Sequence, residues 1–227
     1  MFELNNKITI GISSCLLGNK VRYDGGHKHD RYITETLGRY LTFVPVCPEV
    51  ECGLPIPREA MRLVGDPKNP RLVTRKTNVD VTNRMIGWAK KKTRELAEAD
   101  LCGFIFKSKS PSSGMQRVKF YSDKGMPRKT GVGIFARIFM EQFPRIPVEE
   151  EGRLHDPKLR ENFIERIFIY FYRAIDIKKE PGIPVISIAI LADDNIDYKP
   201  DEYNFRLFGF ELKMKIPIIK IIRPDFR

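Results

Sequence analysis

The chain has 227 residues, of which 42% are hydrophobic, and a formal net charge of +11. This composition excludes a disordered chain, and the length allows one large domain or a domain plus a fragment. No segment approaches the ~18 consecutive apolar residues of a membrane span, and the N-terminus lacks a signal-peptide pattern. We therefore expect a cytoplasmic protein without a membrane partner, in which the four cysteines serve metal binding, chemistry or packing rather than disulfides. The positive charge favours an anionic partner such as nucleic acid or a nucleotide.

Strands and helices alternate along the first two thirds of the chain. The pattern predicts strands at 7–12, 41–46, 101–107 and 118–121. It predicts helices at 30–40, at 83–98 with Thr82 as N-cap, at 131–143 and at 158–175. Residues 64–73 are expected to form a loop, and residues 125–129 a turn. This alternation is typical of an α/β fold with a small, mostly parallel sheet and flanking helices.

The three predicted strands that end near residues 12, 46 and 107 each lead into an unusual loop. The carboxyl ends of parallel strands meet at one edge of a sheet, where binding crevices form. We therefore expect Cys15, the 47–58 loop and the hydroxyl-rich 108–114 loop to lie together at that edge. Arg22, His27 and Lys28 follow Cys15, and such positive surroundings are expected to lower the pKa of its thiol.

The 47–58 loop contains two cysteines, Cys47 and Cys52, with Glu49 between them and three prolines in the same stretch. A rigid loop of this kind suits a functional site. It equally suits a structural turn with two buried thiols, because free cysteine is among the most buried residue types. The loop alone does not separate these two interpretations.

Five motifs together resemble the thiouracil desulfidase family over residues 7–147. They are Ser-Cys-Leu-Leu-Gly at 14–18, Val-Arg-Tyr-Asp-Gly at 21–25, Cys-Pro-Glu at 47–49, Gly-Leu-Pro-Ile-Pro-Arg at 53–58 and Lys-Ser-Lys-Ser-Pro-Ser at 107–112. The resemblance implies removal of sulfur from 2-thiouracil-type bases or nucleosides. It also implies a 4Fe–4S cluster held by three cysteines, with the fourth iron open to the sulfur of the substrate.

The resemblance transfers only part of the family's site to this chain. Cys15 and Cys47 match two cluster ligands, but Ser113 stands where the family pattern has the third cysteine. Cys52 is our expected replacement, with Cys102 in reserve, although Cys102 fits a core position better. Glu49 is expected to move protons. Ser110 and Ser112 are expected to orient the base or the leaving sulfur.

The remaining chain resembles other proteins. Residues 148 to about 166 resemble the start of the helical domain often fused to the desulfidase. Residues 176–227 resemble a β-rich fragment of the recombination-promoting nuclease/putative transposase family, with a strand at 183–191 and a hairpin-like pair within 205–222. The acidic pair Asp193 and Asp194 is expected to end a strand rather than bind a metal.

These resemblances predict three segments: a desulfidase-like domain at 1–147, a linker and helix at 148–175, and an α+β fragment at 176–227. Because its strands lack their natural partners, the last segment is expected either to pack loosely on the first domain or to mediate self-association. Three hypotheses about function follow. The chain is an iron–sulfur desulfidase, a basic nucleic-acid-associated protein, or an inactive fusion product that holds no cluster.

Overall fold

The computed structural model describes residues 8–66, 69–122 and 127–177, together with four short strands in the rest of the chain. The chain divides into two compact units, Met1–Ala174 and Ile175–Arg227. The sequence-based boundary at residue 147 falls inside the first unit, directly before a strand of its main sheet.

The main sheet of the first unit is parallel throughout and follows the order β2-β1-β5-β8. Its strands are β1 (Ile8–Ser13), β2 (Leu41–Val46), β5 (Phe104–Phe106) and β8 (Val148–Glu150). The predicted α/β class with a small parallel sheet is therefore confirmed. β8 was not predicted from the sequence, because this three-residue strand contains two glutamates and lacks the apolar run of its neighbours.

A second sheet of mixed direction follows the order β4-β3-β6-β7. Its strands are β3 (Met61–Asp66), β4 (Asn69–Thr74), β6 (Val118–Tyr121) and β7 (Pro127–Gly131). The expected loop at 64–73 is wrong, since β3 and β4 pair there in antiparallel fashion. The expected turn at 125–129 is wrong from Pro127 onward, and its first two residues lie outside the described part of the chain.

Two longer helices, α2 (Thr82–Ala97) and α3 (Ile134–Gln142), agree with the predicted helical segments. Thr82 is the first residue of α2, and its N-cap is Val81. The Thr82 hydroxyl does not cap the helix but accepts a hydrogen bond from the Leu72 amide at 2.8 Å. Asp80 instead accepts a bond from the Thr82 amide at 2.9 Å. The expected helix at 30–40 is a π-helix, η2 (Tyr32–Thr36), followed by a 3-10 turn, η3 (Leu37–Arg39).

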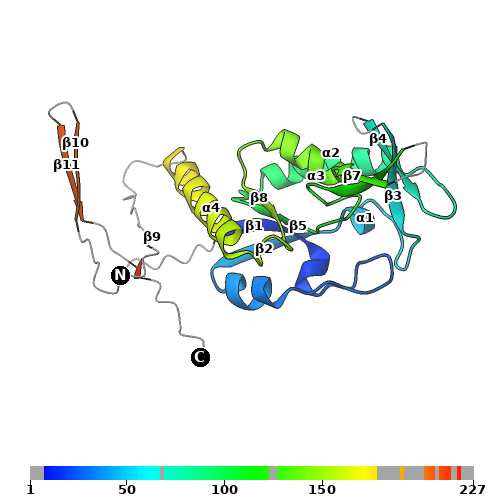
Figure 1. Ribbon diagram of the computed structural model, residues 1–227, viewed down its shortest axis with the longest axis horizontal. Coiled ribbons are helices and arrows are strands. Elements are labelled where there is room, and N and C mark those ends of the chain that lie inside the picture. The colour runs from blue at the N-terminus through cyan, green and yellow to red at the C-terminus, as the bar shows by residue number, and fades with distance from the viewer. Residues whose placement is uncertain are drawn as a thin grey trace. The chain divides into compact units, whose positions relative to one another are not determined.

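The main sheet lies between two apolar layers (Figure 1). On one face Ile10, Ile12 and Ile105 pack with the segment that contains η2 and with the helix that follows β8. On the other face Phe104 and Phe106 pack with α2 and α3. Gly11 faces Phe104 so closely that a Cβ atom there would lie 2.2 Å from the ring. These layers fix the ends of the strands and hence the loops that follow them.

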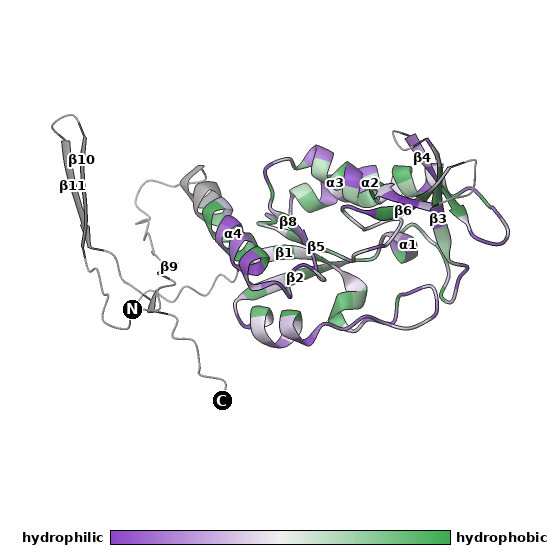
Figure 2. Ribbon diagram, in the orientation of Figure 1, coloured by the Kyte–Doolittle hydropathy of each residue, from purple (hydrophilic) through white to green (hydrophobic). Residues whose placement is uncertain are grey.

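The last helix of the first unit is α4 (Pro157–Ile177), which agrees with the prediction at 158–175. Phe163 and Ile167 are buried against the main sheet, and Figure 2 shows hydrophobic and hydrophilic residues alternating along the described turns of α4. None of the helices that the structure describes is long and apolar enough to cross a membrane.

The second unit contains four short strands within the described residues. They are β9 (Ile190–Leu191), β10 (Glu202–Leu207), β11 (Phe210–Lys215) and β12 (Ile219–Lys220). β10 and β11 form a hairpin that begins before the predicted position, and β9 pairs with β12 in parallel. Residues 183–189 of the predicted strand, and Asp193 and Asp194, lie outside the described part of the chain.

Candidate active site

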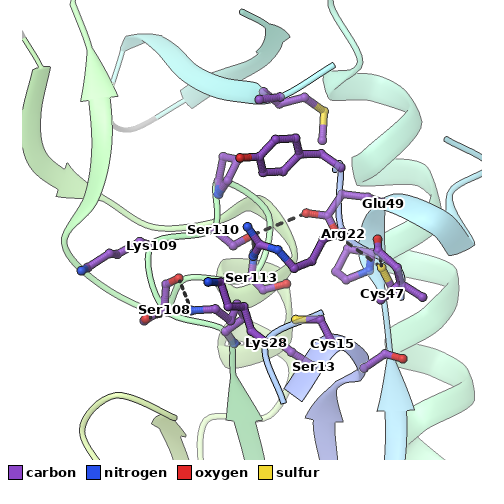
Figure 3. Close-up of a pocket in the computed structure, with 18 of the residues that line it drawn as sticks. Ser13, Cys15, Arg22, Lys28, Cys47, Glu49, Ser108, Lys109, Ser110 and Ser113 are labelled. Atoms are coloured by element: carbon purple, nitrogen blue, oxygen red, sulfur yellow. Dashed lines mark hydrogen bonds between the residues drawn. The ribbon is translucent and has the colours of Figure 1, made fainter. Parts of the chain in front are cut away.

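A pocket of about 700 Å³ opens at the carboxyl ends of β1, β2 and β5. Residues from all three predicted site loops line it, and these include Cys15, Cys47, Glu49, Ser110 and Ser113 (Figure 3). The segment that follows Cys15 and the start of β3 complete its wall. The parallel sheet therefore brings the three loops together, as its topology predicts.

Cys15 lies in a short 3-10 turn, η1 (Ser14–Leu17), directly after β1, and is 8% exposed. Burial raises the pKa of its thiol to about 11, although the Lys107 and Arg22 charges act in the opposite direction. The expected lowering of this pKa is therefore wrong, because the cost of burying a thiolate exceeds the gain from nearby cations. Without a metal, Cys15 is a neutral thiol at neutral pH.

Cys47 is the N-cap of a four-residue helix, α1 (Pro48–Glu51). Its amide donates a hydrogen bond to the Glu51 carboxylate at 2.7 Å, which fixes the turn. Its thiol lies 3.8 Å from the Val21 carbonyl and 3.6 Å from the Glu49 carboxylate. Burial and the Glu49 charge raise the pKa of this thiol to about 12.

Glu49 stands where α1 meets the hydroxyl-rich loop. Ser112 donates a hydrogen bond to one carboxylate oxygen, and Ser110 lies 3.5 Å from the same oxygen. Arg58 approaches the other oxygen at 3.9 Å. Ser110 lines the pocket, whereas Ser112 is fully buried and is not part of the pocket wall. Of the two serines expected to touch substrate, only Ser110 lies where a ligand can reach it.

The hydroxyl-rich loop is docked on the N-terminus of α3. The Ser112 carbonyl accepts hydrogen bonds from the Phe135 and Ala136 amides at 2.9 and 3.1 Å. The Ser110 hydroxyl accepts bonds from the Ser112 and Ser113 amides at 3.2 and 3.1 Å. The first amides of a helix have no partner within the helix, so the loop satisfies them and is fixed in return.

The third expected ligand, Cys52, does not line the pocket. It caps the C-terminal end of α1, and its thiol donates to the Glu49 carbonyl at 3.2 Å. It packs in the apolar cluster between the second sheet and α2, with Leu63 and Met85 among its neighbours. Within the described residues no three His, Cys, Asp or Glu side chains form a metal-binding group.

Ser113 and Cys102 occupy different surroundings. Ser113 lines the pocket and is 3% exposed. Cys102 packs in the core on the face of the main sheet that η2 and α4 cover, where its thiol lies 3.6 Å from the Asp100 carbonyl. The core position favoured from the sequence therefore agrees with the structure, and Cys102 does not line the pocket.

Three further charged residues of the site were given no role from the sequence, although Lys107 and Arg58 belong to motifs quoted above. Lys107 and Glu151 line the pocket and form an ion pair with each other. Arg58 is buried, and its guanidinium donates to the Val21 carbonyl at 3.1 Å. Arg58 belongs to a motif that the resemblance includes, but Glu151 lies in a segment that was interpreted as a linker.

Comparisons with known proteins identify the first unit. The 2-thiouracil desulfurase family model matches residues 10–151. An uncharacterised protein of Bacillus subtilis (strain 168), YbbK, is 28% identical over 146 residues, which are 62% of this chain and 95% of that protein. A solved structure of the [4Fe-4S]-dependent thiouracil desulfidase TudS is similar with a TM-score of 0.55 and 28% identity. That match covers 70% of this chain and 99% of the TudS chain.

Proposed function

Because the chain belongs to the 2-thiouracil desulfurase family, we propose that it is an iron–sulfur-dependent desulfidase acting on 2-thiouracil-type thiolated pyrimidines, as bases or nucleosides. The observation that supports this proposal most strongly is the placement of two buried thiols beside Glu49 in one pocket. The similar solved structure is described as 4Fe–4S-dependent.

The donor chemistry of the pocket suits a 4Fe–4S cluster, because thiolates are the ligands that such clusters prefer. Cys15 and Cys47 would supply two of them. Cys52 is our proposed third ligand, and its thiol would have to leave the Glu49 carbonyl and turn toward the pocket. The Ser113 hydroxyl, which already lines the pocket, is the alternative. Both pocket thiols are protonated in the metal-free protein, so loading would release protons.

A bound cluster with an open iron would supply a Lewis acid for the thiocarbonyl sulfur. The other roles belong to side chains of the chain itself. Glu49 accepts the two protons of the attacking water in turn, one as the oxygen adds to the ring carbon and one as the added hydroxyl becomes the carbonyl, and passes both to the departing sulfur. The carbon–sulfur double bond is replaced by carbon–oxygen, and hydrogen sulfide leaves. Ser110 orients the base or the sulfur. Ser112, which is not part of the pocket wall, donates a hydrogen bond to the Glu49 carboxylate and so fixes its orientation.

Turnover of 2-thiouracil tests this proposal. We expect the anaerobically reconstituted protein to release uracil and sulfide in equal amounts, as followed by chromatography and a sulfide assay. Replacing Glu49 by Gln should lower kcat by about 10²-fold or more, since general acid–base groups contribute that much. The exposed Glu98→Gln change, at the residue that directly follows α2, is the matched control.

Two results would oppose the proposal. One is a reconstituted parent protein that holds a full cluster but leaves every thiolated pyrimidine unchanged. The other is a parent protein that binds no iron, which favours the inactive fusion product. The nucleic-acid partner and the self-association expected from the sequence gain no support from the comparisons and stay predictions.

A further inference from the structure

Three consecutive glutamates lie at the edge of the candidate site: Glu149 and Glu150 end β8, and Glu151 directly follows the strand. Glu149 and Glu150 are each 7% exposed, and the Glu151 side chain is 12% exposed. Glu149 pairs with Arg153 at 2.7 Å. Glu150 and Glu151 instead turn toward the loop of residues 108–116, which follows the neighbouring strand β5. This longer loop includes the hydroxyl-rich loop with Ser110, Ser112 and Ser113.

Glu151 holds the beginning of the loop with both carboxylate oxygens. One oxygen accepts a hydrogen bond from the Ser108 amide at 2.6 Å. The other accepts bonds from the Ser108 hydroxyl at 2.8 Å and from the Lys107 ammonium group. The Lys107 ammonium group also donates to the Ser108 carbonyl at 3.1 Å. The Lys107 charge therefore has a fixed place in the pocket wall.

Glu150 holds the other end of the same loop. One of its oxygens accepts hydrogen bonds from the amides of Met115 and Gln116, at 2.9 and 3.4 Å. The carboxylates of two adjacent residues, the last residue of β8 and the one that follows it, thus hold both ends of the loop. Hydrogen bonds to a charged acceptor are stronger than neutral ones, and partial burial reduces competition from water.

We propose that Glu150 and Glu151 are positioning residues that hold the 108–116 loop, and with it Ser110 and Ser112, at the distance from Glu49 that the reaction needs. The inference rests on the proposed function for its catalytic consequence. Misplacement of a reacting group by about 1 Å can lower a rate by about 10²-fold. Holding both ends of a short loop prevents a displacement of this size.

Amide hydrogen exchange gives a direct test that does not depend on turnover. In the Glu151→Gln variant the Ser108 amide should exchange at least about tenfold faster than in the parent, because an amide group binds Ser108 and Lys107 more weakly than a carboxylate does. In the Glu150→Gln variant the same change should occur at Met115 and Gln116. The exposed Glu161→Gln variant on α4 should match the parent. Unchanged exchange across 108–116 in both variants would overturn the inference.

Kinetics separate positioning from simple stabilisation of the fold. In folded, cluster-loaded Glu151→Gln protein, kcat should fall by about 10²-fold while KM changes little. The Ser108→Ala and Glu151→Gln changes should be strongly non-additive in kcat, because they break the same contact. Parent-like kcat in a variant with full iron content would overturn the inference and leave the proposed function standing. If the parent itself shows no turnover, the proposed function fails, and the exchange experiment alone decides the inference.

Discussion

At the scale of single residues, Glu49 is the point where the segments of the site meet. Its carboxylate is approached by Ser112 and Ser110 from the hydroxyl-rich loop, by the Cys47 thiol and by Arg58. A carboxylate held in this way has one orientation relative to the pocket, which a proton-transfer group requires. Its neighbours therefore matter to the reaction even where they do not reach the ligand.

Replacing Ser112 by Ala tests this arrangement. The change removes the hydrogen bond to Glu49 without altering the pocket wall, because Ser112 is fully buried. We expect kcat for 2-thiouracil to fall by about tenfold or more, with iron content unchanged. Thr93→Ala is the control, since Thr93 is a buried hydroxyl in α2 that bonds the Lys90 carbonyl. Equal kcat values for the two variants would contradict a positioning role.

The sequence identified most of these residues but not their surroundings. Cys15, Cys47, Glu49 and Ser110 all reach the pocket because short motifs after strand ends indicate position reliably. The direction of the Cys15 pKa shift was wrong because the sequence shows charges but not the depth of burial. Cys52 was expected beside Cys47, yet the single turn of α1 points its thiol into a different apolar cluster.

At the scale of elements, the contact between the hydroxyl-rich loop and α3 shapes the site. Gly133 is the N-cap of α3, and a Cβ atom there would lie 2.5 Å from the Ser112 carbonyl group. Only glycine allows the helix and the loop to approach this closely. The helix predicted at 131–143 therefore starts later than expected: Gly131 ends β7, and Gly133 is the glycine that this close approach requires.

The Gly133→Ala change should destabilise the protein by about 1–3 kcal/mol, because the extra methyl group meets backbone that has no room to move. Gly87→Ala is the matched control, since Gly87 lies exposed within α2 and a Cβ there meets nothing within 4 Å. That control should stabilise the protein by about 0.5–1 kcal/mol. Urea denaturation measures both, and a neutral Gly133→Ala would show that the loop is not docked as described.

The contribution of Asp80 to the stability of the protein, made at the start of α2, should depend on pH. Hydrogen bonds from Thr82, with a smaller contribution from the Arg71 charge, lower the pKa of the Asp80 carboxyl below 3.8. A lowered pKa in the folded state adds stability above the unfolded value, and this stability is lost as the pH falls through the folded value. Asp80→Asn should therefore cost about 0.5–1 kcal/mol at pH 7. The difference from the parent should shrink below pH 3.8; a difference that is constant from pH 7 to pH 3 would contradict this.

Elements with a regular hydrophobic pattern were predictable, and those without one were not. The strands β1 and β2 and the helices α2 and α3 follow clear periodicities, and their bounds agree with the prediction within a few residues. The β3–β4 hairpin was missed because the turn-forming residues of this stretch predict a loop, although Leu63 and Leu72 pair across the two strands and are fully buried. β8 was missed because its glutamates bind loops, which no local pattern reveals.

At the scale of the whole molecule, the family match lies within the first of two compact units. The family match ends at residue 151, and the first compact unit continues to Ala174 through β8 and α4. The transposase-like origin of the last segment, and hence a fusion, stays a prediction. The pocket and both apolar layers of the main sheet consist of residues from the first unit.

Because the site and its supporting cores lie within the first unit, a chain shortened after residue 177 should fold and load iron as the full chain does. We expect its melting temperature to lie within about 4 °C of the parent value, which corresponds to at most about 1–2 kcal/mol for a domain of this size. Differential scanning calorimetry on both chains measures this. A shortened chain that is unfolded or binds no iron would show that the second unit supports the site.

The most direct test of the account is the iron and acid-labile sulfide content of the parent after anaerobic reconstitution. We expect close to four of each per chain, with most of the iron lost in Cys15→Ser and Cys47→Ser, because the thiols of both cysteines line the pocket. The Cys52→Ser and Ser113→Ala variants identify the third ligand, and Cys102→Ser should match the parent. A parent protein without iron, or one whose iron is unaffected when Cys15 and Cys47 are both replaced, would contradict the central claim.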